Sequence, residues 1–321
     1  MKPPLIVILG PTASGKTRLA THLAYKLDGE IISVDSRQVY RGMNIGTGKD
    51  LQEYIVNQKA IKYHLIDIVE AGEKYNVYQY QQDFKEVITA IYARQKQPIL
   101  CGGTGLYIEA VLKNYHFTAI PIDENLRQTL SQLSTNELLA KFKALPSVYT
   151  SLADISTRKR LIRAIEIATF LTKNQADEWA NRVSQDKYFS NDYIIFGLTL
   201  PVELRRERIT KRLHERLHNG MIEEVKQLLE KGILPEQLFY YGLEYKFITQ
   251  FIVDQIDYDT MVAQLNVAIH QFAKRQMTFF RKMERDGLTI HWLDATLPTT
   301  QLISTIEYII QEKNESSQKT V

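Results

Sequence analysis

Short runs of apolar residues alternate with amphipathic or polar stretches in the N-terminal and C-terminal parts of this chain. Each run is four to eight residues long and rich in Val, Ile, Leu or Phe, a composition typical of buried strands. The runs predict strands at residues 4–9, 30–34, 63–68, 98–101, 193–200 and 289–295. Because a helical pattern or a polar connection separates each run from the next, we expect an α/β fold with a parallel sheet flanked by helices.

Helices are predicted where apolar residues recur every three or four positions. In residues 18–27, Leu19, Leu23 and Leu27 share one face. The same spacing predicts helices at residues 80–94, 106–112, 137–145, 156–172, 202–231, 259–286 and 302–312. Gly232 supports the end of the helix at 202–231, because glycine is common just past a helix end. We expect the tail, residues 314–321, to be disordered.

The pattern changes between residues 114 and 191. Strand-like alternation is missing from this segment of the sequence, glycines are few, and short helical patterns follow one another. Strand patterns resume at residue 193. The sequence therefore predicts one α/β core, formed by residues 1–113 and 192–321, and a mostly helical insertion at residues 114–191.

A phosphate-binding loop lies between the first predicted strand and the first predicted helix. Residues 10–17 read GPTASGKT and match the pattern G-x-x-x-x-G-K-[ST]. Glycines let backbone N–H groups converge on phosphate oxygens, Lys16 adds a full positive charge, and Thr17 can hold Mg²⁺. We therefore expect a P-loop NTPase-like sheet that binds a diphosphate or triphosphate, whose identity the loop does not specify.

The amino-acid composition limits which cellular compartment and which binding partners we expect for this protein. The 321 residues carry a formal net charge of +3, so a nucleic-acid surface must come from local clusters of basic residues. The single cysteine, Cys101, rules out an internal disulfide framework and a cysteine-based zinc site. The N-terminal apolar run leads directly into the phosphate loop, so we do not expect a cleaved signal, and no stretch approaches the roughly 18 apolar residues of a membrane span. We expect a soluble cytoplasmic protein.

Polar residues follow two of the predicted strands. Asp35, Ser36, Arg37 and Gln38 come after the second strand, at the carboxyl end where open α/β sheets bind ligands. An aspartate at this point is either a ligand of Mg²⁺ or a base that takes a proton from a nucleophile. The fourth strand ends in a second glycine-rich turn, GGTG at residues 102–105, where a backbone or substrate can approach closely. The two glycine-rich loops are expected to line one crevice.

Three basic clusters stand out from the near-neutral background. One is a stripe of arginines three or four residues apart on the predicted helix at 202–231: Arg205, Arg208, Arg212 and Arg216. The others are STRKRLIR at residues 156–163 and AKRQMTFFRK at residues 273–282. The last mixes basic residues with Phe279 and Phe280, which suits contacts to an RNA backbone and to unstacked bases. The clusters suggest one basic concavity.

Taken in order, several segments resemble the tRNA dimethylallyltransferase family. They are GPTASGKT, VDSRQVYRGMNIGTGK, HLIDI, GGTGLY, KRLIRAIEI, the helix containing GMIEEV, and AKRQMTFFR. The resemblance extends from residue 4 to about residue 281. It implies transfer of a five-carbon isoprenoid from dimethylallyl diphosphate to N6 of the adenine next to the anticodon of a tRNA, so the loop would hold an isoprenoid diphosphate.

The resemblance implies a role for each matching position at the reaction centre. Asp35 would be the base that orients the adenine amine and takes its proton as the C–N bond forms. Thr12, Lys16 and Arg208 would be the other catalytic residues, which neutralise the departing diphosphate. The diphosphate-binding residues would be Gly10, Pro11, Thr12, Ala13, Ser14, Gly15, Lys16 and Thr17, with Mg²⁺ on Thr17.

The resemblance also implies how the tRNA is held, by a protein that we expect to be a monomer. An enzyme that acts on a base must take it out of the stack. The residues that would contact the extruded adenine and its neighbours are Asp35, Ser36, Arg37, Gln38 and Thr104. The residues that would grip the anticodon stem-loop are Arg127, Lys159, Arg160, Lys274 and Arg275, with the helical insertion closing over the loop.

Two other classes of protein remain alternatives at this point. The first is a nucleotide-using enzyme, either a P-loop small-molecule kinase or a transferase that prenylates free adenine nucleotides. The second is a non-catalytic RNA-binding module that keeps the phosphate loop only as a structural element. The basic and aromatic segment favours tRNA over a free nucleotide, and the combination of Lys16, Thr17 and Asp35 favours an enzyme over a binding module.

Overall fold

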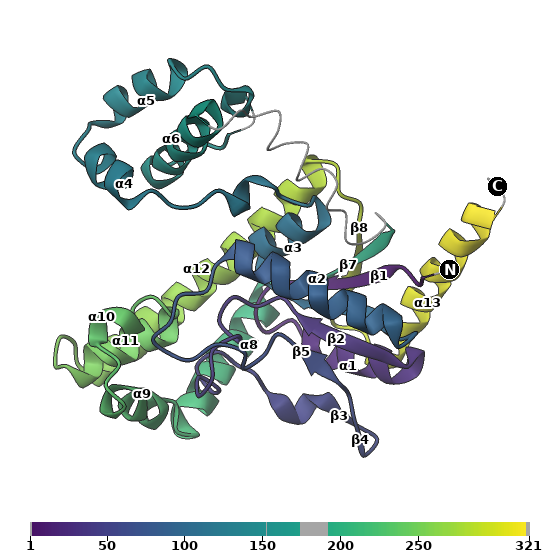
Figure 1. The fold of residues 1–321 in the computed structure, drawn as a ribbon. Helices are drawn as coiled ribbons and strands as arrows, with labels where there is room; N and C mark the ends of the chain where they lie inside the picture. The colour runs from purple at the N-terminus through teal and green to yellow at the C-terminus, as the bar shows by residue number, and fades with distance from the viewer. Residues whose placement is uncertain (1, 152, 174–191, 319–321) are drawn as a thin grey trace. The chain divides into compact units, whose positions relative to one another are not determined.

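The chain divides into two compact units. The computed structural model describes residues 2–151, 153–173 and 192–318 (Figure 1). The first unit comprises Met1–Leu112 and Asn191–Val321, and the second comprises Lys113–Ser190. The first unit contains the sheet and the phosphate loop.

The first unit is built on a six-stranded sheet in the order β5-β2-β6-β1-β7-β8 (Figure 1). All neighbouring strands pair in parallel, as the alternating pattern predicted. The strands are β1 Leu5–Leu9, β2 Gly29–Ser33, β5 Tyr63–His64, β6 Gln97–Gly102, β7 Tyr193–Thr199 and β8 Ile290–Asp294. β5 is shorter than the predicted strand at 63–68, because Leu65 and Asp67 have positive φ angles of 61° and 57°, which end an extended strand.

Helices cover both faces of this sheet. On one face, α1 (Lys16–Leu27) and α13 (Thr299–Gln318) pack against the side chains of Ile6 and Ile8 on β1. Because successive strand residues point to opposite faces, Val7 points to the other face, where α2 (Val77–Ala93) packs against β2 and β6. α3 (Gly105–Leu112) lies beside α2 and contacts α12 (Tyr258–Arg285). The sheet is therefore buried on both sides.

A group of helices follows β7. It consists of α8 Val202–His218, α9 Met221–Glu230, α10 Pro235–Leu238, α11 Leu243–Ile252 and α12. The single helix predicted at 202–231 is wrong: Gly220 has a φ of 95° and separates α8 from α9. A residue in the left-handed conformation ends the first helix, and glycine adopts this conformation without a steric penalty. The predicted end at Gly232 is confirmed, since its φ is 89° and it lies just past α9.

Two further differences from the sequence prediction concern small elements. α13 runs to Gln318, so the tail predicted to be disordered is helical at residues 314–318, and residues 319–321 lie outside the described residues. A two-stranded antiparallel hairpin of β3 (Ile55–Val56) and β4 (Lys59–Ala60) follows a 3₁₀ turn at Leu51–Tyr54. The hairpin strands are too short to produce a readable hydrophobic pattern.

The second unit is helical in its described residues. Its helices are α4 (Glu124–Ser131), α5 (Thr135–Lys143) and α6 (Arg158–Lys173), and short 3₁₀ turns occur at Phe117–Ala119 and Val148–Ser151. Leu130, Leu138 and Phe142 pack against the α6 side chains Leu161 and Ile165 to form a separate small core. Across both units, none of the described helices combines the length and apolar composition that crossing a bilayer requires.

Candidate functional site

Two cavities of the first unit meet at the phosphate loop. One, here called the Asp35 cavity, has a volume of about 550 Å³, and the other, the Ser14 cavity, has a volume of about 830 Å³. Four residues line both of them: Lys16, Thr17, Asp50 and Arg212. Asp35 borders only the first cavity, and Ser14 borders only the second. A group bound to the loop would therefore be reached from both cavities.

The phosphate loop presents unused donors to the Ser14 cavity. Gly15 and Ala13 have positive φ angles of 82° and 61°, so the backbone curls before α1 begins at Lys16. No side chain caps the N-terminus of α1, and its first N–H groups have no intrahelical partners. Ser14 Oγ is buried without a hydrogen-bond partner in the described part of the chain. Unsatisfied donors at a helix N-terminus can bind an anion, and binding of a diphosphate at this loop stays a prediction.

The surroundings of Lys16 change the pKa of its ammonium group. Its Nζ donates a hydrogen bond to the backbone oxygen of Pro11 at 2.7 Å. Burial lowers the pKa of Lys16 to about 8; Arg212 lowers it further, whereas Cys101 and Asp35 raise it. A bound anion would stabilise the protonated ammonium group.

The segment after β2 and the GGTG turn after β6 form one wall of the Asp35 cavity. Asp35 Oδ1 accepts a hydrogen bond from the backbone N–H of Arg37 at 2.9 Å, which fixes the carboxylate. The hydroxyl of Thr104 accepts one from the backbone N–H of Ser36 at 3.0 Å, so the two loops are tied together. As predicted, the two glycine-rich loops line one cavity, since Thr12, Lys16 and Thr17 border it together with the GGTG turn. The lining also includes the predicted residues Asp35, Ser36, Arg37, Gln38 and Thr104.

Gln276 on α12 joins the phosphate loop to the GGTG turn. Its Oε1 accepts a hydrogen bond from the backbone N–H of Thr12 at 2.8 Å, and its Nε2 donates one to the backbone oxygen of Gly103 at 3.0 Å. A Cβ on residue 103 would lie 2.4 Å from Gln276 Nε2, so this approach requires glycine. Sequence reasoning missed Gln276; the only signal was an uncharged amide inside the basic run AKRQMTFFR.

The arginine stripe on α8 contributes differently at each position. Arg212 reaches the phosphate loop and donates a hydrogen bond to the hydroxyl of Thr12. Burial and the neighbouring Arg216 lower the pKa of Arg212 to about 10, so it stays charged at neutral pH. Arg216 pairs with Asp50 at 3.0 Å. Arg208, predicted from the resemblance, lines the Ser14 cavity beside the loop, and Arg212 is the stripe residue that this assignment left out.

Aromatic and basic side chains also line the Asp35 cavity. Phe272, Arg275 and Phe279 from α12 line it, as does Tyr240. The guanidinium of Arg37 lies 5.0 Å from the ring centroid of Tyr240. The other phenylalanine of the basic segment, Phe280, is fully buried in the core. A wall of this kind can hold a planar base by stacking.

The other predicted tRNA contacts are not among the residues that line the two cavities. Lys274 is exposed on α12 and belongs to neither lining. In the second unit, Arg127 makes two hydrogen bonds to Glu166, at 2.8 and 2.9 Å, and Arg160 pairs with Asp154 at 2.7 Å. Lys159 is exposed at the start of α6. Their contacts to RNA stay predictions.

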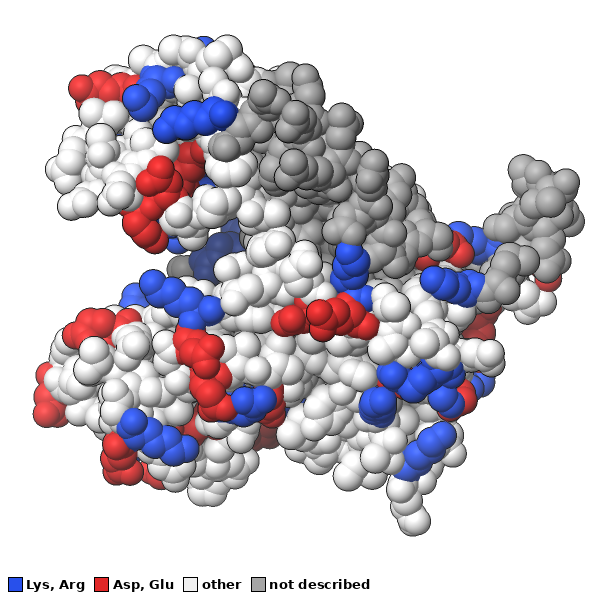
Figure 2. All heavy atoms as spheres, viewed as in Figure 1, with Lys and Arg blue, Asp and Glu red and all other residues white. Residues whose placement is uncertain are grey.

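The surface drawn in Figure 2 does not gather one sign of charge. On the face of the first unit turned toward the viewer, Lys and Arg are interspersed with Asp and Glu. This distribution agrees with the net charge of +3. The basic residues that we consider for ligand binding in the first unit are therefore those that line the two cavities.

The residues present fit Mg²⁺ bound together with a diphosphate. In residues 2–151, 153–173 and 192–318, no three His, Cys, Asp or Glu side chains are grouped so that they could hold a metal by themselves. Mg²⁺ commonly binds through one or two protein ligands together with phosphate oxygens and waters. Thr17 lines both cavities and could supply such a ligand.

Comparisons with known proteins agree with this architecture. The chain is 53% identical over 297 residues to a tRNA dimethylallyltransferase 2 of Porphyromonas gingivalis, which covers 92% of this chain and 96% of that protein. It is 52% identical over 312 residues to a tRNA dimethylallyltransferase 1 of Parabacteroides distasonis, covering 96% and 98% of the two chains.

Solved structures show the same fold along most of the chain. The full-length tRNA isopentenylpyrophosphate transferase of Bacillus halodurans matches with a TM-score of 0.70 and 30% identity, covering 99% of both chains. A eukaryotic dimethylallyltransferase acting on tRNA matches with a TM-score of 0.73 and 26% identity, covering 91% of this chain and 74% of that one. The family model described as IPP transferase matches residues 38–283. The chain therefore belongs to the IPP transferase family.

Proposed function

We propose that this protein transfers a dimethylallyl group from dimethylallyl diphosphate to N6 of the adenine adjacent to the anticodon in tRNA, releasing diphosphate. The observation that carries the proposal is the shared border of the two cavities. A carboxylate, Asp35, and a phosphate loop, represented by Lys16, face the same space, so an acceptor amine and a diphosphate donor can meet there. Members of the family at about half identity are named for this reaction.

The donor diphosphate binds at the loop, on the side of the Ser14 cavity. Backbone N–H groups of the loop, the ammonium of Lys16 and the guanidinium of Arg208 surround this position. Arg212 extends the positive charge to the border with the Asp35 cavity. Mg²⁺ held by Thr17 would add charge neutralisation for the diphosphate oxygens. These groups stabilise the negative charge that grows on the leaving group as the C–O bond breaks.

The acceptor adenine binds in the Asp35 cavity. Tyr240, Phe272 and Phe279 offer aromatic surfaces for an extruded base, and an enzyme that modifies a base must remove it from the stack. The lone pair of the N6 amine forms a bond to the first carbon of the dimethylallyl group, and diphosphate leaves with the electrons of the C–O bond. The N6 proton passes to the carboxylate of Asp35, so atoms and charges balance.

The rest of the tRNA is held by basic residues outside the cavities in this proposal. Lys274 and Arg275 on α12, and Arg127, Lys159 and Arg160 of the second unit, contact the anticodon stem-loop. Contacts of this kind neutralise phosphates and release counterions. We also propose that the protein acts as a monomer in the cytoplasm and does not bind a membrane.

The test is product analysis after incubation with dimethylallyl diphosphate and either unmodified tRNA or AMP, ADP and ATP. We expect N6-dimethylallyl adenosine in the hydrolysed tRNA and no prenylated free nucleotide. Asp35→Ala should lower turnover by roughly 10²-fold, the scale of a lost general base, with tRNA and donor binding retained. Asp259→Asn, an exposed position on α12, is the matched control. Prenylated free nucleotide with none on tRNA refutes the proposal.

A further inference from the structure

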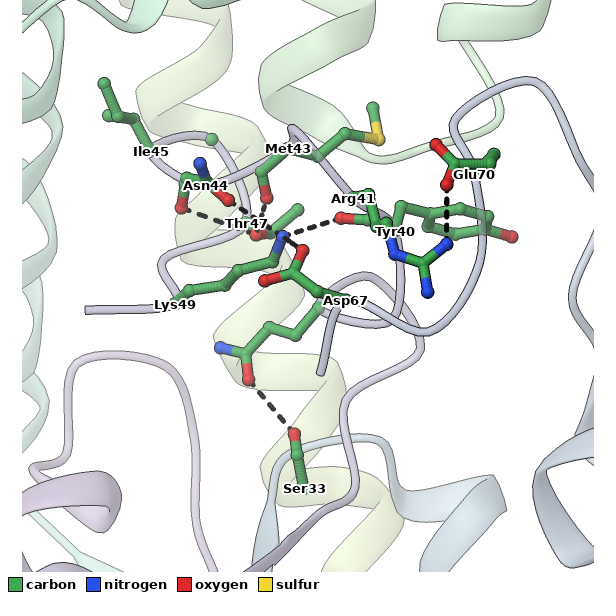
Figure 3. A network of polar contacts seen from close by, with 12 residues as sticks. Ser33, Tyr40, Arg41, Met43, Asn44, Ile45, Thr47, Lys49, Asp67 and Glu70 are labelled. Atoms are coloured by element: carbon green, nitrogen blue, oxygen red, sulfur yellow. Dashed lines mark hydrogen bonds and ion pairs between the residues drawn. The ribbon is translucent and has the colours of Figure 1, made fainter. Parts of the chain in front are cut away.

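The segment at residues 40–49 forms part of the wall of the Asp35 cavity and is held by buried charged side chains (Figure 3). Gly46, Thr47 and Gly48 line the cavity. Gln38 connects the segment to the start of the site, because its Nε2 donates a hydrogen bond to the backbone oxygen of Gly48 at 2.9 Å and its Oε1 accepts one from Ser33 Oγ at 3.1 Å. The shape of this wall therefore depends on what fixes the segment.

Lys49 holds the segment from within. Its Nζ donates hydrogen bonds to the backbone oxygen of Tyr40 at 2.6 Å and to Asn44 Oδ1 at 2.9 Å, and it forms an ion pair with Asp67 (Figure 3). The side chain of Lys49 is only 1% exposed. A buried ammonium with three oxygen partners closes the segment into a loop, because all of its donor protons are used.

Glu224 on α9 holds the same loop from the other side. Its Oε2 accepts hydrogen bonds from the backbone N–H groups of Asn44 and Ile45, at 2.7 and 2.8 Å. Its Oε1 accepts one from the backbone N–H of Gly46 at 3.0 Å and one from the hydroxyl of Tyr245 at 2.7 Å. Glu224 is 8% exposed, so four donors converge on one buried carboxylate.

Other side chains pack closely against the loop that Lys49 and Glu224 hold. A Cβ on residue 46 would lie 2.7 Å from the ring of Tyr245, and one on residue 48 would lie 2.2 Å from Arg216. The break between α8 and α9 at Gly220 lies beside the loop, since a Cβ there would lie 3.9 Å from the side chain of Ile45. The left-handed turn at Gly220 therefore begins the helix that brings Glu224 to the three N–H groups.

We infer that Glu224 is a positioning residue for the acceptor adenine. It does not border either cavity; it acts through the backbone at residues 44–46, which sets the cavity wall at Gly46, Thr47 and Gly48. The inference rests on the proposed function for the identity of the acceptor. Loss of the carboxylate should weaken productive binding of tRNA and leave binding of the diphosphate donor nearly unchanged, because the phosphate loop is held by separate contacts of Gln276 and Arg212.

Hydrogen exchange tests the structural step without any substrate. In Glu224→Gln, the single carbonyl oxygen cannot satisfy four donors, and the new NH₂ group faces some of them. We expect backbone N–H groups at residues 44–46 to exchange at least tenfold faster than in the wild type, and those of residues 10–17 to be unchanged. Glu223→Gln is the matched control, since Glu223 is the exposed neighbour on α9. Equal exchange at residues 44–46 in both variants overturns the inference.

Steady-state kinetics test the functional step. For Glu224→Gln we expect the KM for tRNA to rise about tenfold while the KM for dimethylallyl diphosphate stays within twofold of the wild type. If Glu224→Gln does not fold, Tyr245→Phe is the variant to test, because it removes one of the four hydrogen-bond donors to Glu224. For Tyr245→Phe we expect the KM for tRNA to rise about twofold to threefold.

The outcomes separate the inference from the proposed function. Parallel changes in both KM values, or no change in either, overturn the positioning role while the reaction stands. If the wild-type protein prenylates no tRNA, the proposed function is refuted, and so is the role of the loop in binding the acceptor. This holds even if hydrogen exchange shows that Glu224 fixes the loop at residues 44–46.

Discussion

Replacing Gln276 with leucine should separate the two loops that this side chain joins. Leucine has a similar volume but no polar atoms, so the N–H of Thr12 and the backbone oxygen of Gly103 both lose their partner. A buried polar group left without a hydrogen bond costs about 1–3 kcal/mol, which gives about 2–6 kcal/mol for two. Because Thr12 borders a cavity that water can enter, we expect the lower part of this range, about 2–3 kcal/mol of unfolding free energy.

Urea denaturation followed by circular dichroism would measure this loss, and turnover on tRNA would report its effect on Thr12. The control is Gln271→Leu, at an exposed position of the same helix, which should change the unfolding free energy by less than about 0.5 kcal/mol. Equal unfolding free energies for the two variants would show that Gln276 is not a structural bridge. A destabilised Gln276→Leu protein with wild-type turnover would show that the bridge does not position Thr12.

Two further predictions follow from Lys16 and Gly220. Burial lowers the pKa of Lys16 to about 8, and only its protonated form attracts a diphosphate. We therefore expect kcat/KM for the donor to be constant well below pH 8 and to decrease above it, with a limiting slope of tenfold per pH unit. A constant kcat/KM up to pH 10 would contradict this. Gly220→Ala should lower the unfolding free energy by about 1–2 kcal/mol in urea denaturation, because alanine is strained at a φ of 95°, and unchanged stability would show that the helix break does not need glycine.

The sequence predicted the sheet better than it predicted the contacts that shape the site. Apolar runs identify strands because a parallel strand is buried on both faces, and β1 is fully buried as expected. The helix break at Gly220 was missed because the apolar periodicity continues across it, and a single glycine inside a helical pattern costs only about 1 kcal/mol.

Gln276 and Glu224 could not be found from the sequence for a different reason. Most of their partners are backbone groups that lie far away along the chain: 264 residues separate Gln276 from Thr12, and 180 separate Glu224 from Asn44. Backbone N–H and C=O groups are the same in every residue, so no side-chain pattern marks them. The phosphate loop could be recognised because its pattern lies in consecutive residues between a strand and a helix.

The only cysteine of the chain borders the Asp35 cavity, beside Lys16. Dimethylallyl diphosphate is an alkylating agent, and a thiolate is a far better nucleophile than an aromatic amine. Burial raises the pKa of Cys101 to about 12, which leaves only about one molecule in 10⁵ as thiolate at pH 7. In the proposed reaction, the burial that suppresses ionisation would keep this thiol from competing with the adenine for the dimethylallyl group.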